Sequence, residues 1–154
     1  MNENTDKFDV EVPDGVNCLH FTKIHSIWEP LIVTGGNCSI TGFDLNATEA
    51  FWTVTGDNVR ALESADIDFD GEPELMVGSD DFSIWMFWHE EIIFDIKETS
   101  SISFLSKIEK AMFAFALGNG NIGVYNGSAK KWKMKVDNPV TALKGVDYNI
   151  DGDW

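Results

Sequence analysis

The sequence predicts an all-β fold made of about three and a half four-stranded units, the blades of a β-propeller. Apolar segments return with a period of about 40 residues, and each period contains four short strand-like segments separated by turns rich in Gly, Asn and Asp. The apolar spacing of a helix is missing from every window longer than a few residues, apart from a weak stretch at 106–115. Together these observations favour propeller blades.

The repeat is marked by hairpins that share one pattern: an apolar strand, a turn and an alternating strand that ends in an aromatic residue. The hairpins span 31–43, 75–87 and 113–125. The apolar segments that precede them, and one that follows the last, begin at Val16, Val59, Ile102 and Val140. We therefore expect blades at 16–58, 59–101 and 102–139, the start of another at 140–154, and an acidic, polar lead-in over 1–15.

Individual strands follow from the same pattern. In the second repeat it predicts strands at 59–65, 74–78, 83–87 and 92–96. In the third repeat, 106–115 is interpreted as two strands around a turn at 107–110. The run from Gly118 to Gly123 matches a dinucleotide-binding fingerprint, but no helix follows it, so Asn119-Gly120 is interpreted as a hairpin turn.

Charge and composition exclude several partners. The chain has 11 Lys plus Arg against 26 Asp plus Glu, a formal charge of −15, which would repel a phosphate backbone, so nucleic acid is not expected. The one cationic stretch, 130–135, could contact an acidic partner or lipid headgroups, but lysines also protect exposed edge strands, and we favour that interpretation. No run of 18 apolar residues occurs, so no transmembrane segment is expected. Cys18 and Cys38 form no metal or disulfide pattern.

The motif with the clearest chemistry is an acidic loop at 66–74, directly before an apolar strand. Carboxylates at positions 1, 3, 5 and 9 with glycine at position 6 can surround one hard cation with oxygen ligands. We expect the loop to bind a structural Ca²⁺, and the expected ligands are Asp66, Asp68, Asp70, Glu74 and the backbone carbonyl of Glu72. The alternative is a metal-free turn in which the acids accept backbone hydrogen bonds.

This loop resembles the calcium loops of FG-GAP blades in integrin-type propellers. It is not an EF-hand, because position 12 is Val77 and strands flank it. A second copy of the pattern opens at 147–152, at the same point of the repeat two blades later.

No residues form a recognisable catalytic set. His20, His25 and His89 have no partner at metal-ligand spacing, and no nucleophile signature is present. We therefore expect a protein that is not an enzyme.

Several segments closely resemble the Bardet-Biedl syndrome 2 protein family, whose members are subunits of the BBSome. The segments are 35–38, 51–59, 66–78, 119–125 and 147–152, and the likeness covers nearly the whole chain from Val16 onward. The resemblance implies part of an N-terminal seven-bladed propeller that acts as a non-enzymatic scaffold in ciliary membrane-protein traffic and cilium assembly. It implies other BBSome subunits as partners, peripheral association with the ciliary membrane through the complex, and a location in the cytoplasm, cilium and ciliary basal body.

Two other functional classes remain open from the sequence. An extracellular, integrin-like adhesion propeller would share the calcium loops. An enzyme that uses the central funnel of a propeller would need inward-facing polar clusters, which the sequence does not indicate.

Overall fold

A computed structural model describes residues 8–24, 27 and 29–146, and this part of the chain contains twelve β-strands and no helix. The strands are β1 (Cys18–Thr22), β2 (Leu31–Gly35), β3 (Ser39–Phe43), β4 (Glu49–Val54), β5 (Val59–Ala65), β6 (Glu74–Ser79), β7 (Ser83–Trp88), β8 (Glu91–Lys97), β9 (Ile102–Glu109), β10 (Met112–Leu117), β11 (Asn121–Asn126) and β12 (Ala129–Lys135). Because the described residues include no helix, they also contain none that could cross a membrane.

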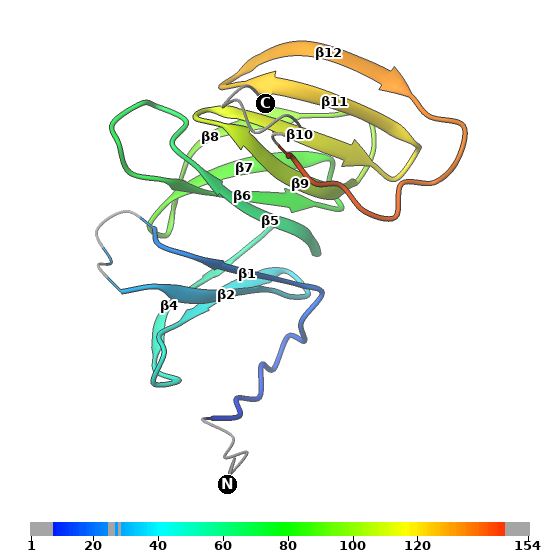
Figure 1. Cartoon of the computed structure of the whole chain (residues 1–154). Coiled ribbons are helices and arrows are strands. Elements are labelled where there is room, and N and C mark those ends of the chain that lie inside the picture. Colours follow the sequence, from blue (N-terminus) through cyan, green and yellow to red (C-terminus); the bar gives the residue numbers. More distant parts are fainter. Residues whose placement is uncertain (1–7, 25–26, 28, 147–154) are drawn as a thin grey trace, which may run out of the picture.

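The strands form three antiparallel four-stranded sheets, in the orders β1-β2-β3-β4, β5-β6-β7-β8 and β9-β10-β11-β12. Figure 1 shows the three sheets following one another through the molecule, with the first and third at opposite ends. We call them blades 1, 2 and 3. The all-β fold and the four-stranded unit predicted from the sequence are confirmed, and the strands of blade 2 lie within one or two residues of the predicted ranges.

The outer strand pair of every blade is irregular at the same point of the repeat. A register shift separates Phe43, Phe87 and Tyr125 from the residue before them in the three blades. A β-bulge of this kind bends the strand and increases its twist. The outer strand pairs of the three blades therefore share the same irregularity.

The turn between β9 and β10 lies elsewhere than predicted. Lys107 pairs with Phe113 inside the sheet, and the reversal occurs at Lys110 and Ala111 instead of at 107–110. Lys110 adopts a left-handed conformation with φ 49°, while the Ala111 side chain is buried. The polar residues had predicted the turn at 107–110. The chain instead turns where the Ala111 side chain is buried. The predicted turn at Asn119-Gly120 is present, with Gly120 at φ 86°.

Two apolar cores lie between the blades. The first joins Leu31, Val33, Ile40 and Phe51 of blade 1 to Val59, Leu62, Leu75, Val77, Trp85 and Phe87 of blade 2. The second joins blade 2 to blade 3 and contains Met76, Ile84, Met86, Phe113, Phe115 and Tyr125 among others. Blade 2 therefore covers blade 1 with one side and blade 3 with the other, which is why β6 and β7 are almost wholly buried.

Glycine allows the first strand of one blade to approach the blade before it. A Cβ at Gly35 would lie 2.4 Å from a Val59 methyl group, and one at Gly78 would lie 2.5 Å from an Ile102 methyl group. These distances are far below van der Waals contact, so no larger residue fits at either position without movement of the next blade.

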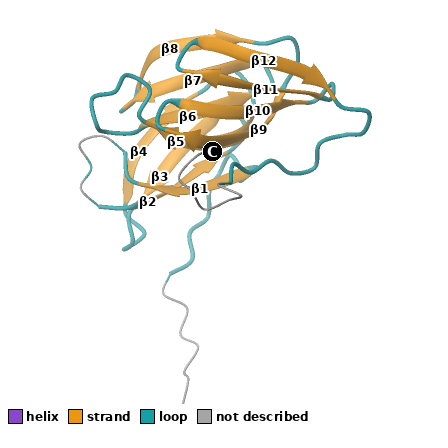
Figure 2. Ribbon diagram, turned by 45° about the horizontal axis from the view of Figure 1, so that its top comes forward, coloured by secondary structure: helices purple, strands orange, loops and turns teal. Residues whose placement is uncertain are grey.

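β5 lies between β1 and β9, the first strands of the other two blades (Figure 2). A polar contact recurs between each of these strands and the segment that follows it in the repeat. The contacts join His20 Nε2 to Ser64 Oγ at 3.0 Å, Lys107 N to Glu63 Oε2 at 3.0 Å, and Gly145 N to Ser106 Oγ at 2.8 Å. The third contact places the segment after blade 3 against β9 much as β9 lies against β5.

Candidate metal centre

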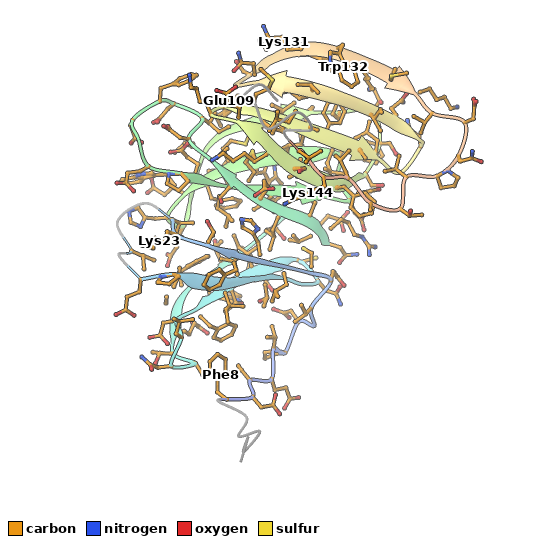
Figure 3. All side chains as sticks on the ribbon, in the orientation of Figure 1. Phe8, Lys23, Glu109, Lys131, Trp132 and Lys144 are labelled. Atoms are coloured by element: carbon orange, nitrogen blue, oxygen red, sulfur yellow. The ribbon has the colours of Figure 1, made fainter. Side chains whose placement is uncertain are left out.

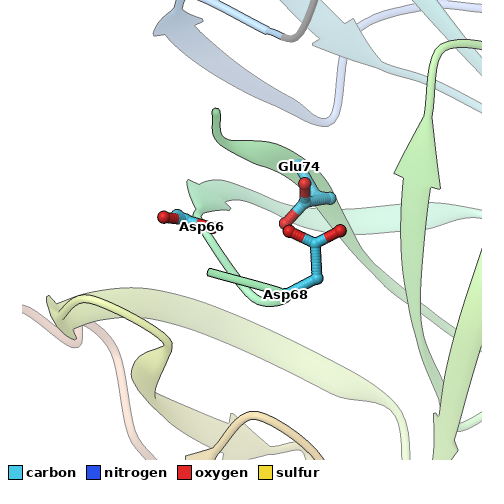
Figure 4. Close-up of side chains that lie close together, drawn as sticks. All are labelled: Asp66, Asp68 and Glu74. Atoms are coloured by element: carbon cyan, nitrogen blue, oxygen red, sulfur yellow. The ribbon is translucent and has the colours of Figure 1, made fainter. Parts of the chain in front are cut away.

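The acidic loop connects the first two strands of blade 2. It leaves β5 after Ala65 and ends where Glu74 begins β6, so the backbone of both ends is held in the sheet. One carboxylate oxygen from each of Asp66, Asp68 and Glu74 lies within 4.8 Å of the other two. Figure 4 shows the Asp68 and Glu74 carboxylates facing each other across the loop, with Asp66 beside them.

The loop also folds on itself through backbone hydrogen bonds. The amide of Gly71 donates to Asp66 Oδ2 at 3.0 Å, and the amide of Asp70 donates to Asp68 Oδ1 at 3.1 Å. Phe69 and Gly71 have φ values of 66° and 94°, which turn the chain sharply between these acids. The acidic residues therefore form the Asx-type turn that the sequence left as an alternative, and that turn leaves Asp66 Oδ1 for another partner.

Two oxygens of the group are buried and have no hydrogen-bond donor: Asp66 Oδ1 and Glu74 Oε1. The Glu74 side chain is only 1% exposed, and its other oxygen accepts the amide of Ile67 at 2.7 Å. Burial raises the pKa of Glu74 above its ordinary value, and the charges of Asp68 and Asp70 raise it further, while the Ile67 amide opposes the shift. A buried carboxylate with an unsatisfied oxygen among other acids is the arrangement that a cation would stabilise.

Not every expected ligand joins this group. The structure brings together carboxylate oxygens of Asp66, Asp68 and Glu74, whereas the Asp70 carboxylate lies outside this group. Asp70 and Glu72 are both exposed, and the backbone carbonyl of Glu72 stays a predicted ligand. Asp70 Oδ1 accepts the amide of Glu72 at 2.8 Å and so helps to close the turn. The second acidic pattern, at 147–152, lies outside the described residues.

A second polar cluster, which the sequence analysis missed, joins blade 2 to the outer edge of blade 3. Glu98 follows β8, and its side chain is fully buried. Its carboxylate accepts hydrogen bonds from Lys130 Nζ at 2.8 Å, Lys133 Nζ at 2.7 Å and the Tyr125 hydroxyl at 2.5 Å. Two lysines of β12, the outermost strand of blade 3, therefore bind one specific acid, Glu98.

The electrostatics of this cluster favour the ionised acid. Burial raises the pKa of Glu98, but hydrogen bonds from Lys130, Lys133 and Tyr125 together outweigh burial and hold the pKa below its ordinary value. Burial and the neighbouring Glu98 carboxylate raise the pKa of Tyr125, so its hydroxyl remains a donor. In the sequence, the lysine run at 130–135 is the one indication of this cluster. It does not identify Glu98, which lies 35 residues before Lys133.

Comparison with known proteins places the chain. The family described as "Ciliary BBSome complex subunit 2, middle region" matches residues 61–154. The chain belongs to this family. Relatives named BBSome complex member BBS2 are 41% identical over 152 residues in Danio rerio and 40% identical over 149 residues in Homo sapiens, covering 99% and 97% of this chain. The chain spans about one fifth (21%) of the length of these relatives.

Solved structures agree on the fold. The propeller protein BBS1N, crystallised in complex with ARL6DN, is similar with a TM-score of 0.68 and 16% identity, over 86% of this chain and 44% of that chain. The computationally designed Ika8 protein is similar with a TM-score of 0.67 and 18% identity, over 86% of this chain and 40% of that chain. The resemblance to the BBSome subunit 2 family is thus confirmed, and the integrin-like alternative has no support among these matches.

Proposed function

We propose that this chain is a scaffold segment of the BBSome subunit 2 family, which acts through surface contact with other BBSome subunits and catalyses no reaction. The observation that carries the proposal is the 41% identity to a BBSome member over 99% of the chain. Rigid blades joined by apolar cores suit such a role, because they hold exposed side chains in fixed positions. The corresponding location is the cytoplasm, cilium and ciliary basal body, with membrane association through the assembled complex.

A segment exchange tests this role. The Danio rerio relative would be produced with this chain in place of its matching region, in cells that lack their own copy of the protein. We expect the hybrid to co-purify with the other BBSome subunits as efficiently as the unaltered relative does. A hybrid that is soluble and folded but binds none of the other subunits would contradict the proposal. Gly78→Val in the hybrid serves as a control with disrupted blade packing.

We further propose that the acidic loop binds Ca²⁺ as a structural ion. The support is the pair of buried, donor-free oxygens, Asp66 Oδ1 and Glu74 Oε1, in a group whose carboxylates approach one another within 4.8 Å. Oxygen-only ligands favour Ca²⁺ or Mg²⁺, and an irregular set of loop carboxylates suits the more flexible coordination of Ca²⁺. Asp66, Asp68 and Glu74 would hold the ion.

Thermal melts with and without millimolar CaCl₂ test the ion. Calcium should raise the melting temperature of the unaltered chain, because a ligand that binds only the native state stabilises it by mass action. Glu74→Gln should abolish this rise and should not lower the melting temperature without calcium, because it removes a buried charge whose Oε1 has no hydrogen-bond donor. Glu72→Gln, on the exposed side of the same loop, should leave the rise intact. An equal rise in Glu74→Gln would exclude this site.

A further inference from the structure

The hairpin that joins β7 to β8 carries large apolar side chains that are open to solvent. Trp88, Ile92 and Ile93 are 38%, 51% and 45% exposed. Blade 2 packs on blade 1 through one apolar core and on blade 3 through the other. A missing neighbouring blade therefore does not explain this exposure. We call the three residues the hairpin patch, and exposed apolar side chains that lie together are typical of interaction sites.

The repeat shows that the fold does not require apolar residues at these positions. In blade 2, Ile92 pairs with Phe87 and Ile93 is the unpaired residue of the bulge. The equivalent residues of Trp88, Ile92 and Ile93 are Asp44, Glu49 and Ala50 in blade 1, and Asn126, Lys130 and Lys131 in blade 3. Blades 1 and 3 therefore form the same sheet without a large apolar side chain at any of these places. The hairpin patch serves something other than the folding of a blade.

A groove of about 330 Å³ lies beside the hairpin, and residues of blades 1 and 2 line it together. Ile24 and Phe51 of blade 1 and Trp88 of blade 2 give it an apolar lining. The rings of Trp88 and His89 meet edge to face, with their centroids 4.3 Å apart. Trp88 belongs to both the groove and the hairpin patch, so the two surfaces are continuous.

Two acids line the same groove. Glu90 and Glu91 are both exposed, and neither forms an ion pair with another residue of the described chain. In a chain with a formal charge of −15, two such acids attract a cation and repel phosphate groups. A long basic side chain fits these walls, because its aliphatic stem can lie on apolar surface while its charged end reaches the acids. The ring of Trp88 adds a surface on which a cation is favoured.

We propose that the groove and the hairpin patch bind an extended, basic segment of a partner protein. The groove takes one Lys or Arg side chain, and Ile92 and Ile93 pack on the apolar residues that flank it in the segment. β8 is the outermost strand of blade 2, and no strand of the described chain pairs with its outer edge. The backbone of the segment can therefore also pair with β8. This proposal goes beyond the scaffold role, because it states the chemistry of one partner and the residues that recognise it.

Fluorescence anisotropy with two labelled peptides tests the recognition on the purified Danio rerio hybrid. The first peptide is Arg-Leu-Arg-Val-Arg-Leu with blocked ends, and the second has Glu in place of every Arg. We expect the hybrid to bind the basic peptide and not the acidic one. Glu90→Lys together with Glu91→Lys should weaken binding of the basic peptide by about tenfold or more, because the groove then repels the basic side chain.

The matched control reverses two acids of blade 3 and its exit. Glu109→Lys together with Asp137→Lys changes the net charge by the same amount. Figure 3 shows Glu109 well separated from Lys23, the residue before Ile24 of the groove, and Asp137 follows β12. This control should change the affinity by no more than about twofold, because distant charges are screened by salt. Equal losses in the two double variants would show attraction to net charge alone and would overturn the proposal.

A third double variant tests the apolar part of the site. Ile92→Ser together with Ile93→Ser should weaken binding of the basic peptide by about tenfold and leave the melting temperature unchanged, because both side chains are already exposed. Unchanged affinity, or no binding of the basic peptide to the unaltered hybrid, would overturn the proposal. Self-association of the hybrid that this variant abolishes in analytical ultracentrifugation would assign the patch to a second copy and would also overturn it. Peptide binding is measured apart from co-purification of BBSome subunits, so failure here is distinct from failure of the scaffold role.

Discussion

At the scale of single residues, the packing between blades depends on a few glycines that leave no space for a side chain. Gly78 is buried in β6, and a Cβ there would lie 2.5 Å from one Ile102 carbon and 2.9 Å from another. The same relation joins Gly35 to Val59. Because the obstructing atoms sit at the branch of a β-branched side chain in a neighbouring strand, they cannot rotate away.

Gly78→Ala should therefore destabilise the protein by about 1–3 kcal/mol, the usual cost of an overpacked core. Chemical denaturation of the single and double variants would measure it. Ile102→Ala should relieve the clash, so the double variant should be less destabilised than the sum of the two single variants. Gly127→Ala is the control for uncoupled strain: no atom lies within 4 Å of its added carbon, but Gly127 has φ 58°, so the substitution should cost about 1 kcal/mol and show no coupling to Ile102→Ala. Strict additivity at Gly78 and Ile102 would show that the two residues do not meet.

Glu98 is the residue whose charge contributes most clearly to the fold. Glu98→Gln should lower the free energy of unfolding by about 1–3 kcal/mol at neutral pH, because the charge-assisted hydrogen bonds from Lys130 and Lys133 are lost. The loss is no larger because water can still solvate both lysines. Glu109→Gln is the matched control, because Glu109 and Lys110 form an exposed pair at 3.9 Å that is worth little.

The same substitution predicts a pH dependence. The pKa of Glu98 is lowered in the folded protein, so its contribution is complete above the ordinary value of 4.5 and is lost as pH falls through the folded value. The difference in unfolding free energy between the unaltered protein and Glu98→Gln should therefore shrink as pH falls from 5 to 3. A constant difference over that range would contradict the assigned ionisation.

At the scale of elements, the sequence predicts most where the repeat is strongest. The hairpins β2–β3, β6–β7 and β10–β11 were predictable, because each has an apolar strand on either side of a short turn. The turn after β9 was not, because Ala111 reads as a weak strand former while the fold buries it. Likewise, Asp66, Asp68 and Glu74 converge as the acidic pattern suggested. Asp70 does not join that group, because its Oδ1 accepts the amide of Glu72 and so helps to close the turn.

The corrected turn offers an element-scale prediction. Lys110 holds a φ of 49° in the two-residue turn, a conformation that costs a residue with a Cβ about 1 kcal/mol relative to glycine. Lys110→Gly should therefore raise the melting temperature. Lys107→Gly, inside β9, should lower it, because glycine weakens a strand. If the turn lay at 107–110 as the sequence suggested, Lys107→Gly would be tolerated as well as Lys110→Gly.

At the scale of the whole molecule, the fold is a repeated contact between blades. The period of about 40 residues predicted the number of strands and their order within a sheet, since a meander follows from short turns. It did not predict how blades meet, because the close approach at Gly35 and Gly78 and the Glu98 cluster depend on side chains far apart in sequence. Nor did it predict that Phe8, Val10 and Val12, in the expected polar lead-in, line a hollow with Leu19, Ile32 and Phe43 of blade 1.

The most direct test of the central claim, that this chain is a run of propeller blades within a BBSome subunit, is cryo-electron microscopy of the complex purified through the Danio rerio hybrid. We expect density for residues 18–135 as three successive four-stranded blades in one ring, with Gly78 against Ile102 and with Glu98 against Lys130 and Lys133. A hybrid subunit that joins the complex with these residues in any other arrangement would contradict the account.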